Sequence, residues 1–329
     1  MRLRRGLRLV RTGEDEVQIG TDPRWAVRLH GLSPVQCRAV LRGTERSLRL
    51  VLPAPVLAEL GTLGLLRPPV PRDLPVPERL VPDCRVTALA RDGDPRAIRE
   101  RRAAATVAVH GLGRTGVQVA VLLASAGIGT VLLADRHRVR GTDLGTGLGP
   151  GEVGRRRTTA VAALLRSTAP GVRTGTAERS GPEPEVVVTV DGDAVDPERT
   201  QALLSAGTAQ VPVVLREADA LVGPTARPGG ACCPRCVELA RADLDPRWPR
   251  VLGLLRAGDD AGAEPVVLAA VAGGLAAAEV LSLVDGDQPV TDGRQYELPL
   301  PSVEPRLRAW AAHPECGCAA LPTGTVTGT

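Results

Sequence analysis

The chain has 329 residues, 43% of them hydrophobic, and a formal net charge of +4. This length and apolar content suffice for one large domain or two unequal ones, and they exclude a mainly disordered chain. Acids and bases are interspersed, and aromatic residues make up only 1% of the sequence. Nucleic-acid-binding proteins concentrate basic charge and stack bases on aromatic rings, so we expect no nucleic-acid partner.

One apolar segment raises the question of a membrane span. Residues 265–284 are long and apolar enough to cross a bilayer, yet they contain Glu279 and are mostly Ala and Gly. We interpret them as a helix buried in a core or a subunit interface, with no membrane partner. The basic N-terminus runs into TGEDEVQ rather than an apolar signal sequence, which predicts a cytoplasmic protein.

The first 67 residues are predicted to form a small winged-helix-like α+β domain. Two short strands are expected before residue 30, and Ser33 followed by Pro34 is typical of a helix N-terminus. A second helix is expected at 56–63, with a strand returning after Gly64. The proline-rich run RPPVPRDLPVPERLVP follows, and residues 68–94 are predicted to be a semi-rigid connector.

Residues 95–320 are predicted to form the large domain, and residues 321–329 a flexible tail. In this domain apolar strand-like runs alternate with helical segments, which predicts an α/β fold with a Rossmann-like, doubly wound and mostly parallel sheet. The expected strands are 107–110, 131–134, 185–190, 211–215 and 295–300, and the expected helices are 114 onward, 152–167, 197–205 and 265–284.

A glycine loop follows the first of these strands. Gly111, Gly113 and Gly116 form G-x-G-x-x-G, and Asp135 ends the next strand. Glycine permits the tight turn and the close backbone approach of a phosphate to the helix N-terminus, and a carboxylate at the position of Asp135 suits ribose hydroxyls. The order of strand, loop, helix, strand and acid predicts a nucleotide site, although a ligand-free structural turn has the same pattern.

Two cysteine pairs lie far apart in the sequence. Cys233 and Cys236 form CPRC, and Cys316 and Cys318 form CGC. Paired thiolates from distant segments suit tetrahedral zinc, and four protein ligands make the metal structural. Cys232 and His313 are spare candidates. A redox C-x-x-C is the alternative for the first pair, but it leaves the second pair unexplained.

Taken together, these features resemble the ThiF/MoeB/HesA adenylyltransferases, relatives of ubiquitin-activating enzymes. The resemblance covers residues 95–320 and includes the glycine loop, the acid after the second strand, EVGRRR, VPVVLREADALVGPTARPGGACCPRC, the Ala-rich helix and the terminal CGC. With WAVRLHGL ahead of it, the arrangement is most similar to ThiF-like proteins of ribosomal-peptide (azole-type) tailoring pathways. In those proteins an N-terminal winged-helix-like element docks the leader peptide of a precursor.

The resemblance implies a homodimer that uses ATP and Mg²⁺ to adenylate the carboxylate of a peptide or a small carrier protein. It also implies a partner tailoring enzyme and places part of the dimer contact on 265–284. In this family Arg157 falls at the phosphate-binding lysine, Asp191 or Asp193 at the metal-binding aspartate, and Asp143 at an asparagine that reaches ATP. The glycines would then cradle phosphate and Asp135 would bind ribose.

The sequence also departs from the family, and these departures keep alternatives open. No arginine follows Asp143 in GTDLGTGLG, and no cysteine lies between Cys236 and Cys316 to form a thioester. The arginines at 155–157 suit phosphate, but such a run is equally typical of a solvated helix face. One alternative is therefore a catalytically silent scaffold that presents a precursor peptide to a partner enzyme. An NAD-dependent oxidoreductase and a DNA-reading winged helix are further alternatives.

Overall fold

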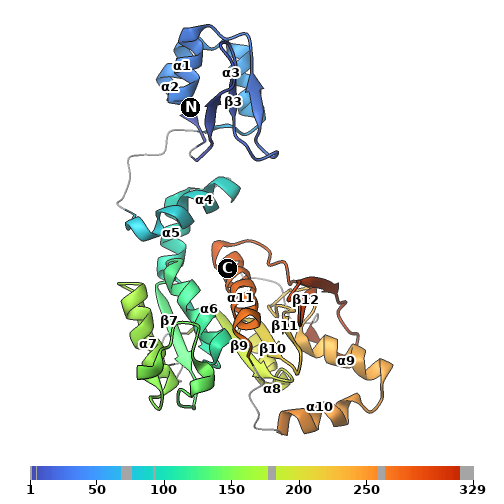
Figure 1. Cartoon of the computed structure of the whole chain (residues 1–329). Helices are drawn as coiled ribbons and strands as arrows, with labels where there is room; N and C mark the ends of the chain where they lie inside the picture. Colours follow the sequence, from blue (N-terminus) through green and yellow to red (C-terminus); the bar gives the residue numbers. More distant parts are fainter. Residues whose placement is uncertain are drawn as a thin grey trace, which may run out of the picture. The chain divides into compact units, whose positions relative to one another are not determined.

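The computed structural model describes residues 2–4, 6–67, 76–91, 94–176, 183–257 and 264–318. The chain forms two compact units, Met1–Arg99 and Glu100–Thr329 (Figure 1). The expected tail at 321–329 and the segment 68–75 of the expected connector lie outside the described residues.

The N-terminal unit begins with short strands and helices. Over the described part of residues 2–67, strands β2, β3 and β4 form an antiparallel sheet in that order, and β1 pairs antiparallel with β5. Val17, Ile19 and Val40 are fully buried in its core. The elements are β1 (Arg2–Leu3), β2 (Leu9–Arg11), β3 (Val17–Ile19), β4 (Val27–Leu29), α1 (Pro34–Arg42), α2 (Glu45–Val51), α3 (Ala54–Thr62) and β5 (Leu66–Arg67).

Local sequence determines how α1 starts and ends. The Ser33 side chain accepts from the N–H of Gln36, the Gln36 side chain accepts in return from the N–H of Ser33, and Pro34 occupies the first turn. Gly43 ends the helix at φ +61°, a left-handed conformation that favours glycine. Strands β3, β4 and β5 and helices α1 and α3 follow the sequence prediction. Strands β1 and β2 and helix α2 were not indicated by the sequence pattern.

Helical structure also extends into the segment expected to be a connector. A short 3₁₀ turn, η1 (Glu78–Leu80), leads into α4 (Val81–Arg91), and α5 (Pro95–Ala104) follows. Pro82 lies in the first turn of α4, where a missing N–H costs nothing, and Cys84 and Ala88 are buried one turn apart. Residues 78–91 of the segment expected to be a connector are therefore helical.

The large unit is built on an eight-stranded sheet in the order β13-β12-β11-β10-β9-β6-β7-β8. Neighbours from β8 through β10 are parallel, and β10 through β13 are antiparallel. The mostly parallel α/β sheet predicted from the sequence is thus confirmed, with an antiparallel extension at one edge. The strands are β6 (Thr106–His110), β7 (Thr130–Ala134), β8 (Arg173–Thr176), β9 (Val186–Gly192), β10 (Ala209–Leu215), β11 (Asp219–Val222), β12 (Arg294–Pro299) and β13 (Arg306–Ala309).

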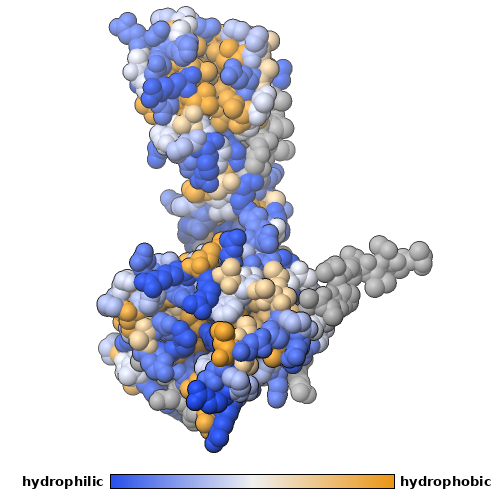
Figure 2. All heavy atoms as spheres, turned by 90° about the vertical axis from the view of Figure 1, so that its right-hand side faces the viewer, coloured by the Kyte–Doolittle hydropathy of each residue, from blue (hydrophilic) through white to orange (hydrophobic). Residues whose placement is uncertain are grey.

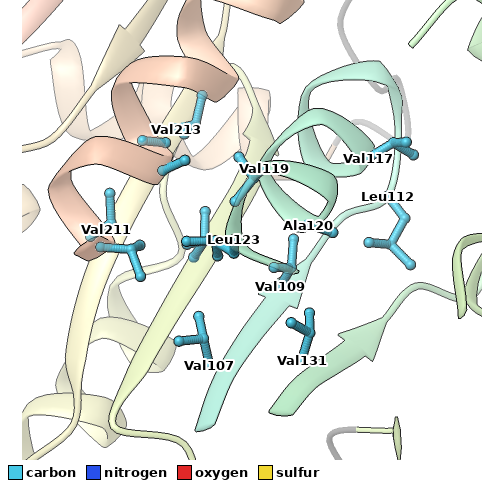
Figure 3. Packing of buried hydrophobic residues seen from close by; sticks show 14 of the residues in the cluster. Val107, Val109, Leu112, Val117, Val119, Ala120, Leu123, Val131, Val211 and Val213 are labelled. Atoms are coloured by element: carbon cyan, nitrogen blue, oxygen red, sulfur yellow. The ribbon is translucent and has the colours of Figure 1, made fainter. Parts of the chain in front are cut away.

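Helices cover both faces of this sheet. Val107 and Val109 of β6 face a core shared with α6, α7 and α11, and Figure 3 shows part of this core. Ala108 between them packs on the other face, against Leu203 of α8. This alternation places side chains of one strand in two separate cores, so both faces must be apolar. The helices are α6 (Arg114–Ser125), α7 (Arg157–Thr168), α8 (Pro197–Ser205), α9 (Pro234–Leu244), α10 (Trp248–Ala257) and α11 (Val266–Asp285), with 3₁₀ turns η2 (Gly141–Asp143) and η3 (Pro150–Glu152).

Helix α11 is the one helix in the described part of the chain that is long and apolar enough to cross a membrane. It packs along α6 and against β9, β10 and β11. Its buried Glu279 accepts hydrogen bonds from the N–H and Oγ1 of Thr291, at 2.8 and 2.6 Å. These contacts give α11 the role of a core helix in this unit, as the sequence predicts.

Candidate functional site

The glycine loop connects β6 to α6, and each glycine meets a different requirement. Gly111 has φ +83°, and a Cβ there would lie 2.5 Å from the carbonyl oxygen of Val190. A Cβ on Gly116 would lie 1.8 Å from the carbonyl oxygen of Gly111. Gly113 caps α6 without a side-chain hydrogen bond. The loop therefore presents backbone N–H groups at a helix N-terminus, which is the geometry that binds anions.

Asp135 ends β7 and binds this loop directly. Its carboxylate accepts from the N–H of Leu112 and from the N–H of His137, both at 2.7 Å, and from Nη1 of Arg157 at 3.1 Å. Burial alone raises the pKa of Asp135, but the two backbone hydrogen bonds and the arginine outweigh it and hold the pKa below its usual range. Asp135 is thus an ionised acid whose oxygens already have donors.

Arg157 begins α7 and lies between two carboxylates. Its Nε and Nη2 donate to Asp143 at 3.0 and 2.6 Å, and Nη1 donates to Asp135. All three side chains are less than a tenth exposed. The other two arginines of the run, Arg155 and Arg156, are exposed. Only Arg157 therefore enters the predicted site, and there two carboxylates balance its charge.

Asp191 lies near the end of β9, beside β6, and pairs with an arginine that the sequence analysis did not identify. Nη2 of Arg199 on α8 donates to Asp191 at 2.5 Å. Burial raises the pKa of Asp191, and the pairing with Arg199 only partly opposes this. His110, at the end of β6, has its pKa lowered to about 4 by burial and by the charge of Arg199. Asp193 has a positive φ of 59°.

Two further residues that the sequence analysis did not identify, Arg114 and Glu264, make contacts at the start of α6. Oε2 of Glu264, just before α11, accepts from the N–H of Thr115 at 2.7 Å. Arg114 donates from Nε to the carbonyl of Leu144 and from Nη1 to the carbonyl of Glu264, both at 2.8 Å. Glu264 is 149 residues from Thr115, so no local pattern could have connected them.

The structure brings the predicted nucleotide-site residues to the carboxyl ends of neighbouring parallel strands, where open α/β sheets bind ligands. Arg157 pairs there with Asp135 and Asp143, and Arg199 pairs with Asp191, whereas Arg114 and Glu264 bind backbone groups. The residues are Gly111, Gly113, Gly116, Asp135, Asp143, Arg157 and Asp191, joined by Arg114, Arg199 and Glu264.

The four predicted metal ligands form a separate cluster. Cys233 caps α9, Cys236 lies in its first turn, and Cys316 and Cys318 come from the turn that follows β13. Their sulfur atoms all lie within 4.8 Å of one another, with Cys233–Cys236, Cys233–Cys316 and Cys236–Cys318 at 3.9, 3.4 and 3.4 Å. Thiolates about 2.3 Å from a tetrahedral zinc are about 3.8 Å apart, so the donor set fits zinc.

The spare candidates have other partners. The Cys232 thiol donates to the carbonyl of Cys233 at 3.4 Å, and Nε2 of His313 lies 2.9 Å from an Asp243 oxygen. Burial and hydrogen bonds from neighbouring thiols raise the pKa of Cys318 to about 12. Four thiols this close cannot ionise together without a cation among them, which the zinc would supply.

The N-terminal unit has a cavity of its own. A pocket of about 250 Å³ is lined by apolar side chains and one arginine from α2, α3 and β5, and Figure 2 shows apolar surface on this unit. Its size suits one or two aliphatic side chains of a ligand. The lining residues are Leu48, Arg49, Ala54, Leu57, Ala58 and Leu66.

A model of the ThiF family matches residues 87–318. The chain belongs to the ThiF family. The match contains the glycine loop, the acids and arginines around it and the four clustered cysteines. The resemblance inferred from the sequence is thereby confirmed. No curated protein matches the chain closely enough to count as a relative.

Solved structures of other proteins share the fold of this ThiF-family chain. E. coli MccB with succinimide matches with a TM-score of 0.73 and 16% identity, covering 97% of this chain and 98% of MccB. E. coli MccB with ATP gives a TM-score of 0.71 at 16% identity, covering 96% and 98%. PaaA gives 0.68 at 16% identity, covering 93% and 98%. At this identity the likeness establishes the fold, and it extends over nearly the whole chain.

Proposed function

We propose that this ThiF-family protein uses ATP to activate the carboxylate of a peptide. A carboxylate oxygen would attack the α-phosphorus of ATP, the bond from that phosphorus to the bridging oxygen would break, and pyrophosphate would leave with the electron pair. The product is an acyl-adenylate. The observation that carries the proposal is the glycine loop in the ThiF fold, with backbone N–H groups at the start of α6 and Asp135 beside it.

The side chains have distinct roles in this proposal. The N-terminus of α6 would bind phosphate, Asp135 would face the ribose, and Arg157 would neutralise phosphate charge in place of the family's lysine. Mg²⁺ would neutralise further phosphate charge, and Asp191 would hold it after Arg199 moves away. Asp193 is the second candidate for that role. The carboxylate set is oxygen-rich, as Mg²⁺ requires, but its present partners are arginines.

A peptide substrate is favoured over a carrier protein by the neighbouring structures. One of them is described as the microcin C7 biosynthetic enzyme MccB in complex with N-formylated MccA. In this chain residues 1–67, within the N-terminal unit, would dock the leader part of a precursor through the apolar pocket on α2 and α3. We further propose that the protein acts with a partner tailoring enzyme in the cytoplasm. It would form a homodimer through exposed residues of α11. Zinc would stabilise the C-terminal region without taking part in the reaction.

The decisive experiment is the exchange of labelled pyrophosphate into ATP in the presence of a candidate precursor peptide. Activation predicts exchange that depends on the peptide and on Mg²⁺ and that falls at least tenfold in Asp191→Asn. Glu304→Gln, an exposed acid outside the site, is the matched control and should leave exchange unchanged. Absence of exchange with any peptide that binds to the protein would sink the proposal.

A second candidate function is the catalytically silent scaffold. The observation that favours it is the double pairing of Arg157 with Asp135 and Asp143, which leaves no net positive charge for a triphosphate. A scaffold predicts tight peptide binding that is unaffected by ATP, together with no pyrophosphate exchange. Calorimetric titration of the peptide with and without ATP separates the two functions. Membership of the ThiF family favours both over an NAD-dependent oxidoreductase.

A further inference from the structure

The N-terminus of α6 already holds a carboxylate from within the chain. Oε2 of Glu264 accepts from the N–H of Thr115 at 2.7 Å. The three atoms nearest to a Cβ built on Gly113 would all belong to Glu264, and the nearest, Oε1, would lie at 1.9 Å. The close approach that Gly113 permits is therefore made by Glu264, at the place where a Rossmann loop receives phosphate.

The position of Glu264 is held from two sides. Arg114 donates to the carbonyl of Glu264 and to the carbonyl of Leu144, which links the residue to the loop after β7. Pro265, the next residue, caps α11, and α11 packs along α6. Glu264 is thus positioned by α11, which it precedes, and by the first turn of α6, which its carboxylate contacts.

We propose that Glu264 is an internal competitor for the phosphate position, and that a nucleotide must displace it to bind. This inference rests on the proposed function, because it concerns the same site. The helix N-terminus favours a single anion within its first turn. A carboxylate within hydrogen-bond distance of that position would repel a phosphate and would use the N–H of Thr115 that the phosphate needs.

The inference is tested by calorimetric titration of the full-length protein with ATP and, separately, with inorganic pyrophosphate. The variants are Glu264→Gln, which removes the charge and keeps the shape, and Glu264→Ala, which removes the whole group. In wild type, a nucleotide that displaces Glu264 breaks the hydrogen bond between this carboxylate and the Thr115 N–H, which weakens binding. Glu264→Ala has no such bond to break, so we expect it to bind both ligands about 10- to 100-fold more tightly than wild type. The affinity of Glu264→Gln should lie between those of wild type and Glu264→Ala, and the affinity of Glu304→Gln should equal that of wild type.

A second measurement follows the contact itself. Hydrogen exchange at the Thr115 amide should be slow in wild type and faster in Glu264→Ala, and saturating pyrophosphate should slow it again in the variant. Equal exchange in wild type and Glu264→Ala would contradict the contact. Far-ultraviolet circular dichroism checks that the variants are folded.

The outcomes separate this inference from the proposed function. If wild type binds ATP as tightly as Glu264→Ala, the competitor is disproved while ATP-dependent activation stands. If the Glu264 variants bind ATP more tightly than wild type, but neither wild type nor the variants catalyse pyrophosphate exchange with a peptide bound, the competitor role of Glu264 is supported and ATP-dependent activation is disproved. If neither wild type nor Glu264→Ala binds either ligand at millimolar concentration, both are overturned. Weaker ATP binding by Glu264→Ala only with Mg²⁺ would identify a metal ligand instead, and would also overturn the inference.

Discussion

Arg157 and Asp143 form a two-pronged ion pair in the interior of the large unit. Nε and Nη2 of the guanidinium donate to the two carboxylate oxygens at 3.0 and 2.6 Å, and the side chains are 8% and 6% exposed. The remaining Nη1 binds Asp135 at 3.1 Å. Charges buried to this extent are tolerated only when they are paired, so the arginine and the two acids depend on one another.

Replacing Asp143 with Asn is expected to have two opposite effects. The amide keeps the shape but weakens the pair, which should lower the free energy of unfolding by about 1–3 kcal/mol, with Asp135 still balancing Arg157. Pyrophosphate should bind more tightly, because the arginine charge is no longer over-balanced. Urea unfolding and calorimetric titration measure the two effects.

The control for this substitution is Asp245→Asn, because Asp245 pairs with Arg247 on the surface, where the side chains are 44% and 86% exposed. Such exposed pairs contribute little to stability, so Asp245→Asn should unfold at nearly the same urea concentration as wild type. Equal changes in the two variants would show that burial of the Arg157 pair has no energetic consequence.

Gly116 is expected to tolerate no side chain. In Gly116→Ala the new Cβ would lie 1.8 Å from the carbonyl oxygen of Gly111, and neither backbone segment can move without shifting β6 or α6. We expect a loss of at least about 3 kcal/mol, at the upper end of overpacking costs. Gly274 in α11 is the matched control, because a Cβ there would meet no other side chain or neighbouring backbone within 4 Å. Gly274→Ala should stabilise the protein by up to about 1 kcal/mol, and thermal unfolding of both variants compares them.

The sequence predicted the parts of the fold that depend on local pattern. Apolar runs located β6, β7, β9 and β10, and the glycine loop located the start of α6. Helix α7 was expected from residue 152 but begins at Arg157, because Gly154 has φ +87° and interrupts the helix. Helix α2 was not expected, since Ser-Leu-Arg-Leu-Val-Leu alternates like a strand and becomes helical when Leu48 packs into the core. Strands β8, β11 and β13 and helices α9 and α10 were also not predicted.

The candidate site was predictable only in part, because local sequence patterns reveal some of its residues and tertiary packing brings in the others. Glycines and cysteines have conformational and chemical roles that their spacing reveals, so the loop and the four-cysteine cluster could be found. The pairing of Asp191 with Arg199, and the placement of Glu264 against Thr115, depend on how strands and helices pack. Charged residues of this kind are common in the sequence, and nothing in their neighbourhood distinguishes the few that enter the site.

One zinc ion per chain is expected in the purified protein. Cys236→Ser removes a thiolate from the cluster and should reduce bound zinc to a small fraction of an equivalent, while lowering the melting temperature. Cys232→Ser is the control, because Cys232 lies outside the four, and serine keeps a donor both for the carbonyl of Cys233 and for the contact with Cys236. It should keep a full equivalent of zinc. Metal analysis by mass spectrometry measures the zinc bound to each variant. Zinc loss in both variants, or in neither, would contradict the assignment of the four cysteines as the zinc ligands.

His110 is expected to make the stability of the protein depend on pH. Burial and the charge of Arg199 lower its pKa from 6.5 to about 4, so the folded state keeps the ring neutral between these values while the unfolded state takes up a proton. The free energy of unfolding should therefore fall as the pH is lowered from about 6.5 to about 4, by at most ~3 kcal/mol, and this contribution should level off below pH 4.

Carboxylates such as Asp135 also lose stabilisation at low pH, because their pKa is lowered in the folded state. The contribution of His110 is therefore measured as a difference between wild type and His110→Gln, which cannot titrate. Urea unfolding at half-unit steps from pH 4 to 7 should give a shallower slope for the variant, because the contribution of the acids is shared by the two proteins and cancels in the difference. Parallel curves would mean that the His110 ring is protonated to the same extent in the folded and unfolded protein, and that Arg199 has no influence on it.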